Sequence, residues 1–282
     1  MATKHTVTIM GSKVAYWVSN PDKKRVIVMV HGFRGTHEGL DEITSRLGDF
    51  QVIVPDLPGF GESTPFKNGN SHDIEHYAAF LKKFLQILEL DRPVLLGHSF
   101  GSIIAAHFTA QNNAMIDKLI LVNPINAPAL KGPKAAMTQL AVIYYGLSKK
   151  LPEKMAKKLM SNKQLIFVMS TFMAKTKDKE LRKEIHQQHY THFSRFATMQ
   201  TLEESFHASV SHTAREVAHN ISVPTLLIAG DKDDITSIKV QHAAVKDYPK
   251  GELITIKDVG HLIHYEKPVE AVMAINVFLG SS

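Results

Sequence analysis

The chain has 282 residues, of which 44% are hydrophobic and 21% are charged, and its formal net charge is +6 with no cysteine. These proportions are those of a globular protein, long enough for one large α/β domain with an insertion or for two modest domains, and they exclude an intrinsically disordered chain. Without cysteine the chain cannot form disulfides, use a thiolate nucleophile or hold a cysteine-ligated metal, and we expect a cytoplasmic location by default.

The first third of the chain alternates strand-like and helix-like segments. It begins with alternating apolar and polar residues instead of a continuous apolar stretch, so we expect no secretory signal. No apolar run in the sequence approaches the roughly 18 to 20 residues that a transmembrane helix requires. We expect a hairpin of residues 5–10 and 13–19, followed by two buried strands of a parallel sheet at 25–30 and 50–56. A helix capped by Asp73 is expected at 73–90.

The same alternation continues in the remaining two thirds, with one long interruption. Strands are expected at residues 93–97, 118–124, 222–230 and 252–258, and helices at 102–111, 237–248 and 268–280. Residues 125–213 have helical patterns and no convincing strand. We therefore expect the α/β fold class, with a mostly parallel, doubly wound sheet in a core of residues 1–124 and 214–282, and 125–213 as a helical insertion.

The segment Gly-His-Ser-Phe-Gly at 97–101 lies between an expected strand and an expected helix. Gly and Ser are common in any turn, and the five-residue pattern is short enough to occur by chance. In a strand-turn-helix context, however, G-x-S-x-G places the serine on a tight, strained turn with small neighbours, because strand and helix approach closely. The pattern predicts that Ser99 is a nucleophile, which needs a histidine base and a carboxylate that orients the histidine.

Five ordered motifs cover nearly the whole chain and resemble those of the α/β-hydrolase family. They are HGF at 31–33, DLPGFGES at 56–63, GHSFG at 97–101, GDKDDIT at 230–236 and VGHLIHYEKP at 259–268. Nucleophile, acid and histidine follow one another in the order that the family uses. The resemblance implies an α/β-hydrolase fold, Ser99 as the nucleophile, His261 as the general base and then acid, and Asp233 as the orienting carboxylate.

The acid has competitors of the same residue type. In the family the carboxylate usually lies three residues after the glycine that ends the strand, which leads from Gly230 to Asp233. Asp231 is the runner-up, and Asp234 is expected to be a loop or capping carboxylate. Some family members carry the acid after the preceding strand, where this chain has Asn123, an amide that cannot take the charge.

The histidine also has competitors, because the sequence contains 16 of them. His264 falls in a segment that resembles the start of packed structure, whereas His261 follows Gly260 in an expected loop. For His31 and His98, next to the motif turns, we expect hydrogen-bonded buried imidazoles, although His98 is also a candidate for substrate contact.

Backbone N–H groups stabilise the oxyanion in this family. The resemblance points to the N–H of Phe100, after the nucleophile, and to that of Phe33 in the loop after the third strand. Arg34 follows directly and is a candidate for binding an acidic group of the substrate. The alternative for Arg34 is a solvated loop charge.

Three histidines, His186, His189 and His192, are spaced three residues apart, as metal ligands can be. On a helix this spacing alone is more often polar surface, so we expect no metal there. The other motifs require no cofactor either.

The insertion differs from the rest of the chain in charge. Between Lys131 and Gln200 there are 14 Lys and Arg against 4 Asp and Glu, a local charge of +10, so the remainder carries −4. Insertions at this point usually form a lid over the nucleophile, and the apolar residues of this one are expected to line an acyl cavity. A row of Lys154, Lys157 and Lys158 could contact anionic membrane surfaces, although a solvated helix face is at least as frequent.

These features together predict a serine hydrolase that acts on small-molecule carboxylic esters with short or medium acyl chains, such as monoacylglycerols. The alternatives are a receptor-like protein of this fold with little turnover, or another serine-dependent branch: a thioesterase, a perhydrolase or a carbon–carbon hydrolase. The sequence GHSFGS departs from the GNSxGG that carbon–carbon hydrolases commonly have. We expect no nucleic-acid partner, and the sequence leaves the oligomeric state open.

Overall fold

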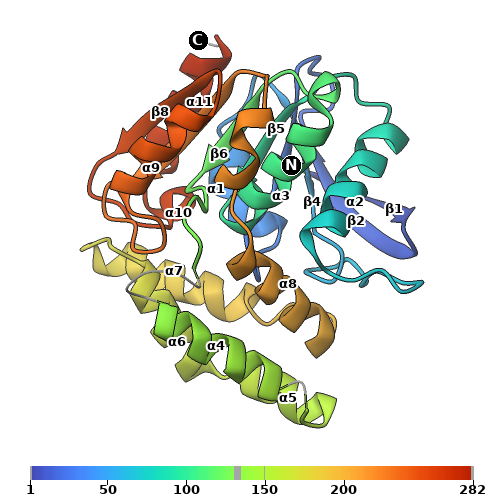
Figure 1. Ribbon diagram of the computed structural model, residues 1–282, viewed down its shortest axis with the longest axis vertical. Coiled ribbons are helices and arrows are strands. Elements are labelled where there is room, and N and C mark those ends of the chain that lie inside the picture. Colours follow the sequence, from blue (N-terminus) through green and yellow to red (C-terminus); the bar gives the residue numbers. More distant parts are fainter. Residues whose placement is uncertain (1, 130–134, 149, 281–282) are drawn as a thin grey trace.

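The computed structural model describes residues 2–129, 135–148 and 150–280, and an eight-stranded sheet forms its centre (Figure 1). The strands are β1 (Thr3–Ile9), β2 (Ser12–Ser19), β3 (Val26–Val30), β4 (Gln51–Pro55), β5 (Val94–His98), β6 (Leu119–Val122), β7 (Thr225–Gly230) and β8 (Gly251–Ile256). Their order across the sheet is β1-β2-β4-β3-β5-β6-β7-β8. β2 pairs antiparallel with β1 and β4, and β3 to β8 are parallel to one another. The expected mostly parallel sheet is confirmed.

Helices cover both faces of this sheet. The helices outside the insertion are α1 (Asp41–Thr44), α2 (Ile74–Ile87), α3 (Phe100–Gln111), α9 (Ile238–Ala244), α10 (Ile263–Glu266) and α11 (Pro268–Leu279), with short 3-10 turns η1 (His37–Leu40), η2 (Asn113–Met115), η3 (Arg215–Asn220) and η4 (Val245–Asp247). α2 and α3 pack on one face and α1 and α11 on the other. Asp73 caps α2 as expected, because its carboxylate accepts the His76 N–H at 2.8 Å.

The central strands β3 and β6 are apolar at every position because each faces two cores. Val28 and Val30 of β3 pack with α2 and α3, whereas Ile27 and Met29 pack with α1 and α11. Successive strand side chains point to opposite faces, so burial on both sides requires a continuous apolar run.

The segment between β6 and β7 forms a group of helices of its own. They are α4 (Ala135–Ser148), α5 (Glu153–Met160), α6 (Lys163–Met173), α7 (Lys179–His192) and α8 (Met199–Ser211). Figure 1 shows them gathered on one side of the sheet domain. An isolated bridge between Phe60 and Phe196 joins the loop after β4 to the loop after α7. Among the described residues, none of the helices has the combined length and apolar character that crossing a bilayer would require.

The parallel strands end along one edge of the sheet, and the loops that follow them meet there. Residues 31–34 follow β3, Ser99 follows β5, Asn123 follows β6, residues 231–233 follow β7 and residues 257–261 follow β8. In open α/β sheets this carboxyl edge is where ligands bind. Candidate residues from four separate motifs, together with Asn123, are therefore brought to one place.

Candidate active site

Ser99 lies on a strained turn between β5 and α3. Its backbone has φ 54° and ψ −119°, a left-handed conformation that residues other than glycine rarely adopt. The Ser102 hydroxyl holds the turn by donating to the Ser99 carbonyl at 2.5 Å and accepting the Ile125 N–H at 3.1 Å. The turn directs the Ser99 side chain away from the packed strand and helix, as the motif predicts.

Glycine is required on both sides of this turn. A Cβ atom on Gly97 would lie 2.3 Å from the Gly101 carbonyl oxygen, and one on Gly101 would lie 2.2 Å from the Val30 carbonyl oxygen. Neither backbone oxygen can move without displacing β3 or α3, so α3 can approach the sheet this closely only with glycine at these positions.

Replacing Gly101 with alanine is therefore expected to lower the free energy of unfolding by roughly 1–3 kcal/mol, the usual cost of inserting a methyl group into a packed core. Urea denaturation measures this loss. Gly48→Ala is the matched control, because a Cβ there meets no atom within 4 Å. Equal stability of Gly101→Ala and the wild type would contradict the close approach.

Ser99, His261 and Asp233 form one hydrogen-bonded row. The Ser99 Oγ lies 2.8 Å from His261 Nε2, and His261 Nδ1 lies 2.9 Å from Asp233 Oδ2. Both His261 and Asp233 are buried. In this arrangement the imidazole donates from Nδ1 to the carboxylate and accepts the serine proton at Nε2.

The carboxylate of Asp233 is held in its charged form by its surroundings. Burial alone would raise its pKa, but the charge and hydrogen bond of His261, the Ile235 N–H and the Asn123 amide outweigh burial and lower it below the usual range. The Ile235 N–H donates to Oδ1 at 2.7 Å, and Asn123 Nδ2 donates to Oδ2 at 3.0 Å. A charged, oriented carboxylate is what a catalytic histidine needs.

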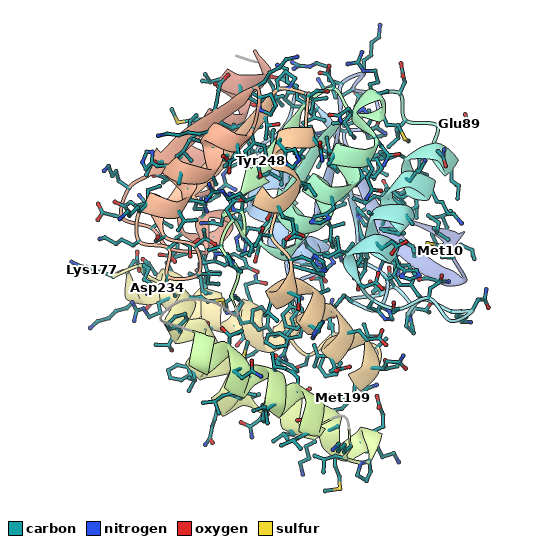
Figure 2. All side chains as sticks on the ribbon, viewed as in Figure 1. Met10, Glu89, Lys177, Met199, Asp234 and Tyr248 are labelled. Carbon is teal, nitrogen blue, oxygen red and sulfur yellow. The ribbon has the colours of Figure 1, made fainter. Side chains whose placement is uncertain are left out.

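The other acidic candidates lie elsewhere. Asp234 forms an ion pair with Lys175 at the junction of the sheet domain and the helical segment, where Figure 2 labels it. Asp231 is partly exposed, and its Oδ1 is buried without a hydrogen-bond partner in the described part of the chain. Of the three aspartates, Asp233 is the one hydrogen-bonded to His261.

Asn123 has a part that the sequence analysis missed. It was considered only as a possible acid, yet its Nδ2 donates to both Asp233 Oδ2 and the Gly260 carbonyl, at 3.0 and 3.1 Å. It therefore links the loop that carries Asp233 to the loop that carries His261. Its place at the carboxyl end of β6, between β5, which leads to Ser99, and β7, which leads to Asp233, was the available signal.

Two backbone N–H groups near Ser99 have no acceptor. Within the described ranges, neither the Phe33 N–H nor the Phe100 N–H donates to a protein atom. Gly32 brings the first of these loops close, because a Cβ on Gly32 would lie 3.2 Å from the Cβ of Ser99. Free donors at these positions can bind a developing oxyanion.

Burial disfavours the charged form of the remaining histidines around Ser99, because it lowers their pKa values. His31 is structural, as expected: its Nε2 accepts the Leu57 N–H at 2.9 Å and its Nδ1 donates to the Gly32 carbonyl at 2.8 Å. Burial, together with nearby His261, lowers the pKa of His98 to about 3, and burial lowers the pKa of His264 well below its usual value. These two rings lie against each other with centroids 4.0 Å apart. Their neutrality avoids repulsion of a proton on His261.

Two cavities meet at Ser99 and His261. The larger, of about 220 Å³, is mostly apolar and is lined by Phe100, Ile125, Met169, Phe206 and Val210 together with Arg34. The smaller, of about 60 Å³, is lined by five imidazoles, those of His31, His98, His189, His261 and His264. The larger cavity suits an aliphatic acyl group.

Two of the three spaced histidines of α7 share one hydrogen-bond partner, and the third has a partner of its own. The Nδ1 atoms of His186 and His189 both contact the Ser170 hydroxyl, at 2.6 and 2.7 Å. His192 Nε2 donates to Gln188 Oε1 at 2.9 Å. These contacts account for the spacing without a metal.

Comparisons with known proteins identify the fold family of the chain. A family model described as alpha/beta hydrolase fold matches residues 25–268. Lipase 1 of Psychrobacter immobilis is 24% identical over 267 residues, which cover 89% of this chain and 76% of the lipase. The crystal structure of bromoperoxidase from Bacillus anthracis has a TM-score of 0.82 at 16% identity and covers 99% of this chain and 100% of that one. A thermophilic esterase from Thermogutta terrifontis has a TM-score of 0.76 at 21% identity, with 99% and 98% covered.

Proposed function

Because the chain belongs to the α/β-hydrolase fold family, we propose that it is a serine hydrolase that cleaves carboxylic esters of short or medium acyl chains through an acyl-enzyme. The observation that carries the proposal is the hydrogen-bonded row of Ser99, His261 and Asp233. The lipase and esterase names of its relatives favour ester substrates over the other bonds that such a site can hydrolyse. Its cytoplasmic location stays a prediction.

In the proposed mechanism the Ser99 Oγ attacks the ester carbonyl carbon while His261 Nε2 takes the serine proton. The resulting oxyanion accepts hydrogen bonds from the Phe33 and Phe100 N–H groups. Collapse of the intermediate breaks the carbon–oxygen bond to the alcohol, which leaves with the proton from His261. Water, deprotonated by His261, then attacks the acyl-enzyme and releases the acid and Ser99.

A fluorophosphonate probe tests the mechanism directly, because it phosphonylates a serine only where a base activates it. We expect stoichiometric labelling of Ser99, identified by peptide mass spectrometry, and hydrolysis of a 4-nitrophenyl ester series with an optimum at short or medium chains. Tight binding of a small ligand without labelling or turnover would contradict the proposal and indicate a receptor-like protein.

We further propose that the helices α4–α8 act as a lid whose outer surface contacts lipid. Large apolar side chains are exposed there, including Leu140, Leu147, Met155, Phe167 and Val168. Lys154 and Lys158 are exposed beside them on α5. Lys157, expected in the same row, is partly exposed, and its Nζ donates to the Ala197 carbonyl at 2.6 Å and lies 3.5 Å from Glu153 Oε1. An exposed apolar surface with flanking lysines suits an anionic interface.

Reversing the two exposed charges, with Lys154→Glu and Lys158→Glu together, is expected to slow hydrolysis of esters in anionic vesicles on the order of tenfold at low salt. The loss should shrink as salt rises. Lys82→Glu with Lys83→Glu, on the exposed side of α2, is the matched control. An equal loss on a small soluble ester, or no loss on vesicles, would contradict the lipid contact.

A further inference from the structure

Arg34 is a buried cation in the wall of the larger cavity. Its side chain is among the largest that are fully buried, with 1% of the residue exposed. The sequence analysis offered a solvated loop charge as the alternative, and this burial contradicts it. Arg34 follows Phe33 directly and has a left-handed backbone, with φ 58°. Arg34 is among the residues that line the cavity of the nucleophile, and it is adjacent in the chain to one of the free N–H groups.

The hydrogen-bond partners of Arg34 are all neutral. Nε donates to the Phe193 carbonyl at 2.8 Å, Nη2 to the Met160 carbonyl at 2.9 Å, and Nη1 to the Tyr145 hydroxyl at 3.4 Å. The rings of Phe193 and Phe196 lie 5.6 and 5.7 Å from its guanidinium carbon. Throughout the described ranges, no Asp or Glu side chain forms an ion pair with it.

These contacts orient the guanidinium without neutralising it. A guanidinium has five N–H groups, and each terminal nitrogen here has one protein acceptor for its two hydrogens. A buried charge is costly unless an opposite charge accompanies it. A neutral side chain could donate hydrogen bonds to the same carbonyl groups. Attachment of the helical segment through these hydrogen bonds therefore does not by itself explain a positive charge at this position.

Resting on the ester hydrolysis proposed above, we propose that Arg34 binds a carboxylate carried by the acyl part of the substrate, so that the substrates are half-esters of short dicarboxylic acids. The rest of the cavity is apolar and suits the methylene chain between the two ends. One guanidinium balances a carboxylate, which carries one charge, better than a phosphate, which carries nearly two. The excess positive charge of residues 131–200 would also steer anions toward the site.

Two esters of equal size test this. Monomethyl glutarate and methyl 5-methylhexanoate differ only in that a carboxylate replaces an isopropyl group, and pH-stat titration follows the hydrolysis of both. The wild type is expected to prefer the half-ester in kcat/KM. The specificity ratio is kcat/KM for the half-ester divided by kcat/KM for the neutral ester. Arg34→Gln should lower this ratio on the order of 30-fold or more, because it removes one partner of a buried charge pair. Arg34→Lys should restore part of the ratio.

Arg195→Gln is the matched control, since Arg195 is also an arginine at the junction with the helical segment but pairs with Glu38. It should leave the ratio within about twofold of the wild-type value, as expected of a partly exposed ion pair. Circular dichroism and thermal unfolding check that each variant is folded. A wild type without preference for the half-ester, or an Arg34→Gln variant that loses both activities equally, would overturn the inference and leave Arg34 as an anchor.

Calorimetric titration of Ser99→Ala protein with monomethyl glutarate separates this inference from the proposed function. If Ser99→Ala binds monomethyl glutarate and the added Arg34→Gln substitution weakens this binding, the carboxylate site is supported. If the wild type then hydrolyses neither ester, only the esterase proposal is contradicted. If monomethyl glutarate does not bind to Ser99→Ala but the wild type hydrolyses the neutral ester, only the carboxylate site is contradicted.

Discussion

Replacing Ser99 with alanine is expected to lower kcat for 4-nitrophenyl esters by about 10⁴- to 10⁶-fold, because no other group can form the acyl-enzyme. The value of kcat/KM should decrease as well. The residual rate enhancement should come from substrate binding and the two N–H groups alone. Steady-state kinetics measure the loss, and the fluorophosphonate probe should no longer label the protein. More than a tenth of the wild-type activity in a folded variant would remove Ser99 from the mechanism.

A second substitution at this position separates activity from stability. Ser99 has φ 54°, where glycine is free of the steric conflict that other residues meet. Ser99→Gly should therefore be as inactive as Ser99→Ala but unfold at an equal or higher temperature, since it relieves strain at the turn. A lower Tm for Ser99→Gly than for Ser99→Ala would show that the turn is not strained in the way its backbone angles indicate.

The sheet could be predicted from the sequence because its strands are locally distinctive. Val26–Val30 and Thr225–Gly230 are short apolar runs bounded by polar residues, as strands buried on both faces are. Ser99 could be located for a similar reason, since both glycines beside it are fixed by close backbone contacts. The strands and the serine turn could be predicted from a single sequence because both depend on residues that are close together in the chain.

The missed features depend on contacts between distant segments. Arg34 is buried only because Met160 and Phe193, more than a hundred residues away, close over it. Asn123 matters because two loops from later strands reach it. Lys157 is less exposed than Lys154 and Lys158 of the expected basic row, and its Nζ donates to the Ala197 carbonyl. None of these partners is visible in the local sequence, which left Arg34 with two interpretations, binding of an acidic group or a solvated loop charge, and placed Lys157 in an exposed basic row.

Replacing Asp233 with asparagine is expected to reduce kcat/KM by about 10⁴-fold. The amide would have to present its oxygen to His261, yet the N–H groups of Ile235 and Asn123 also donate toward this side chain. If its NH₂ group faces His261 instead, the imidazole is held in the wrong tautomer and cannot accept the serine proton. Asp231→Asn and Asp234→Asn should each cost less than about tenfold. A larger loss from Asp231→Asn would assign the orienting role to the runner-up.

Asn123 permits a sharper form of this test, since its side chain lies 3.0 Å from the Asp233 carboxylate. Combining Asp233→Asn with Asn123→Asp moves the negative charge to the end of the neighbouring strand while keeping one carboxylate and one amide in the pair. If Asp233 acts by presenting charge to His261, the double variant should recover activity by about tenfold or more over Asp233→Asn, because a carboxylate is restored next to the side chain that the imidazole contacts. Asn123→Asp alone should be impaired, because two buried carboxylates would repel each other. A double variant no better than Asp233→Asn, with the fold intact by circular dichroism, would mean that His261 requires the carboxylate at the end of β7 and nowhere else on this edge.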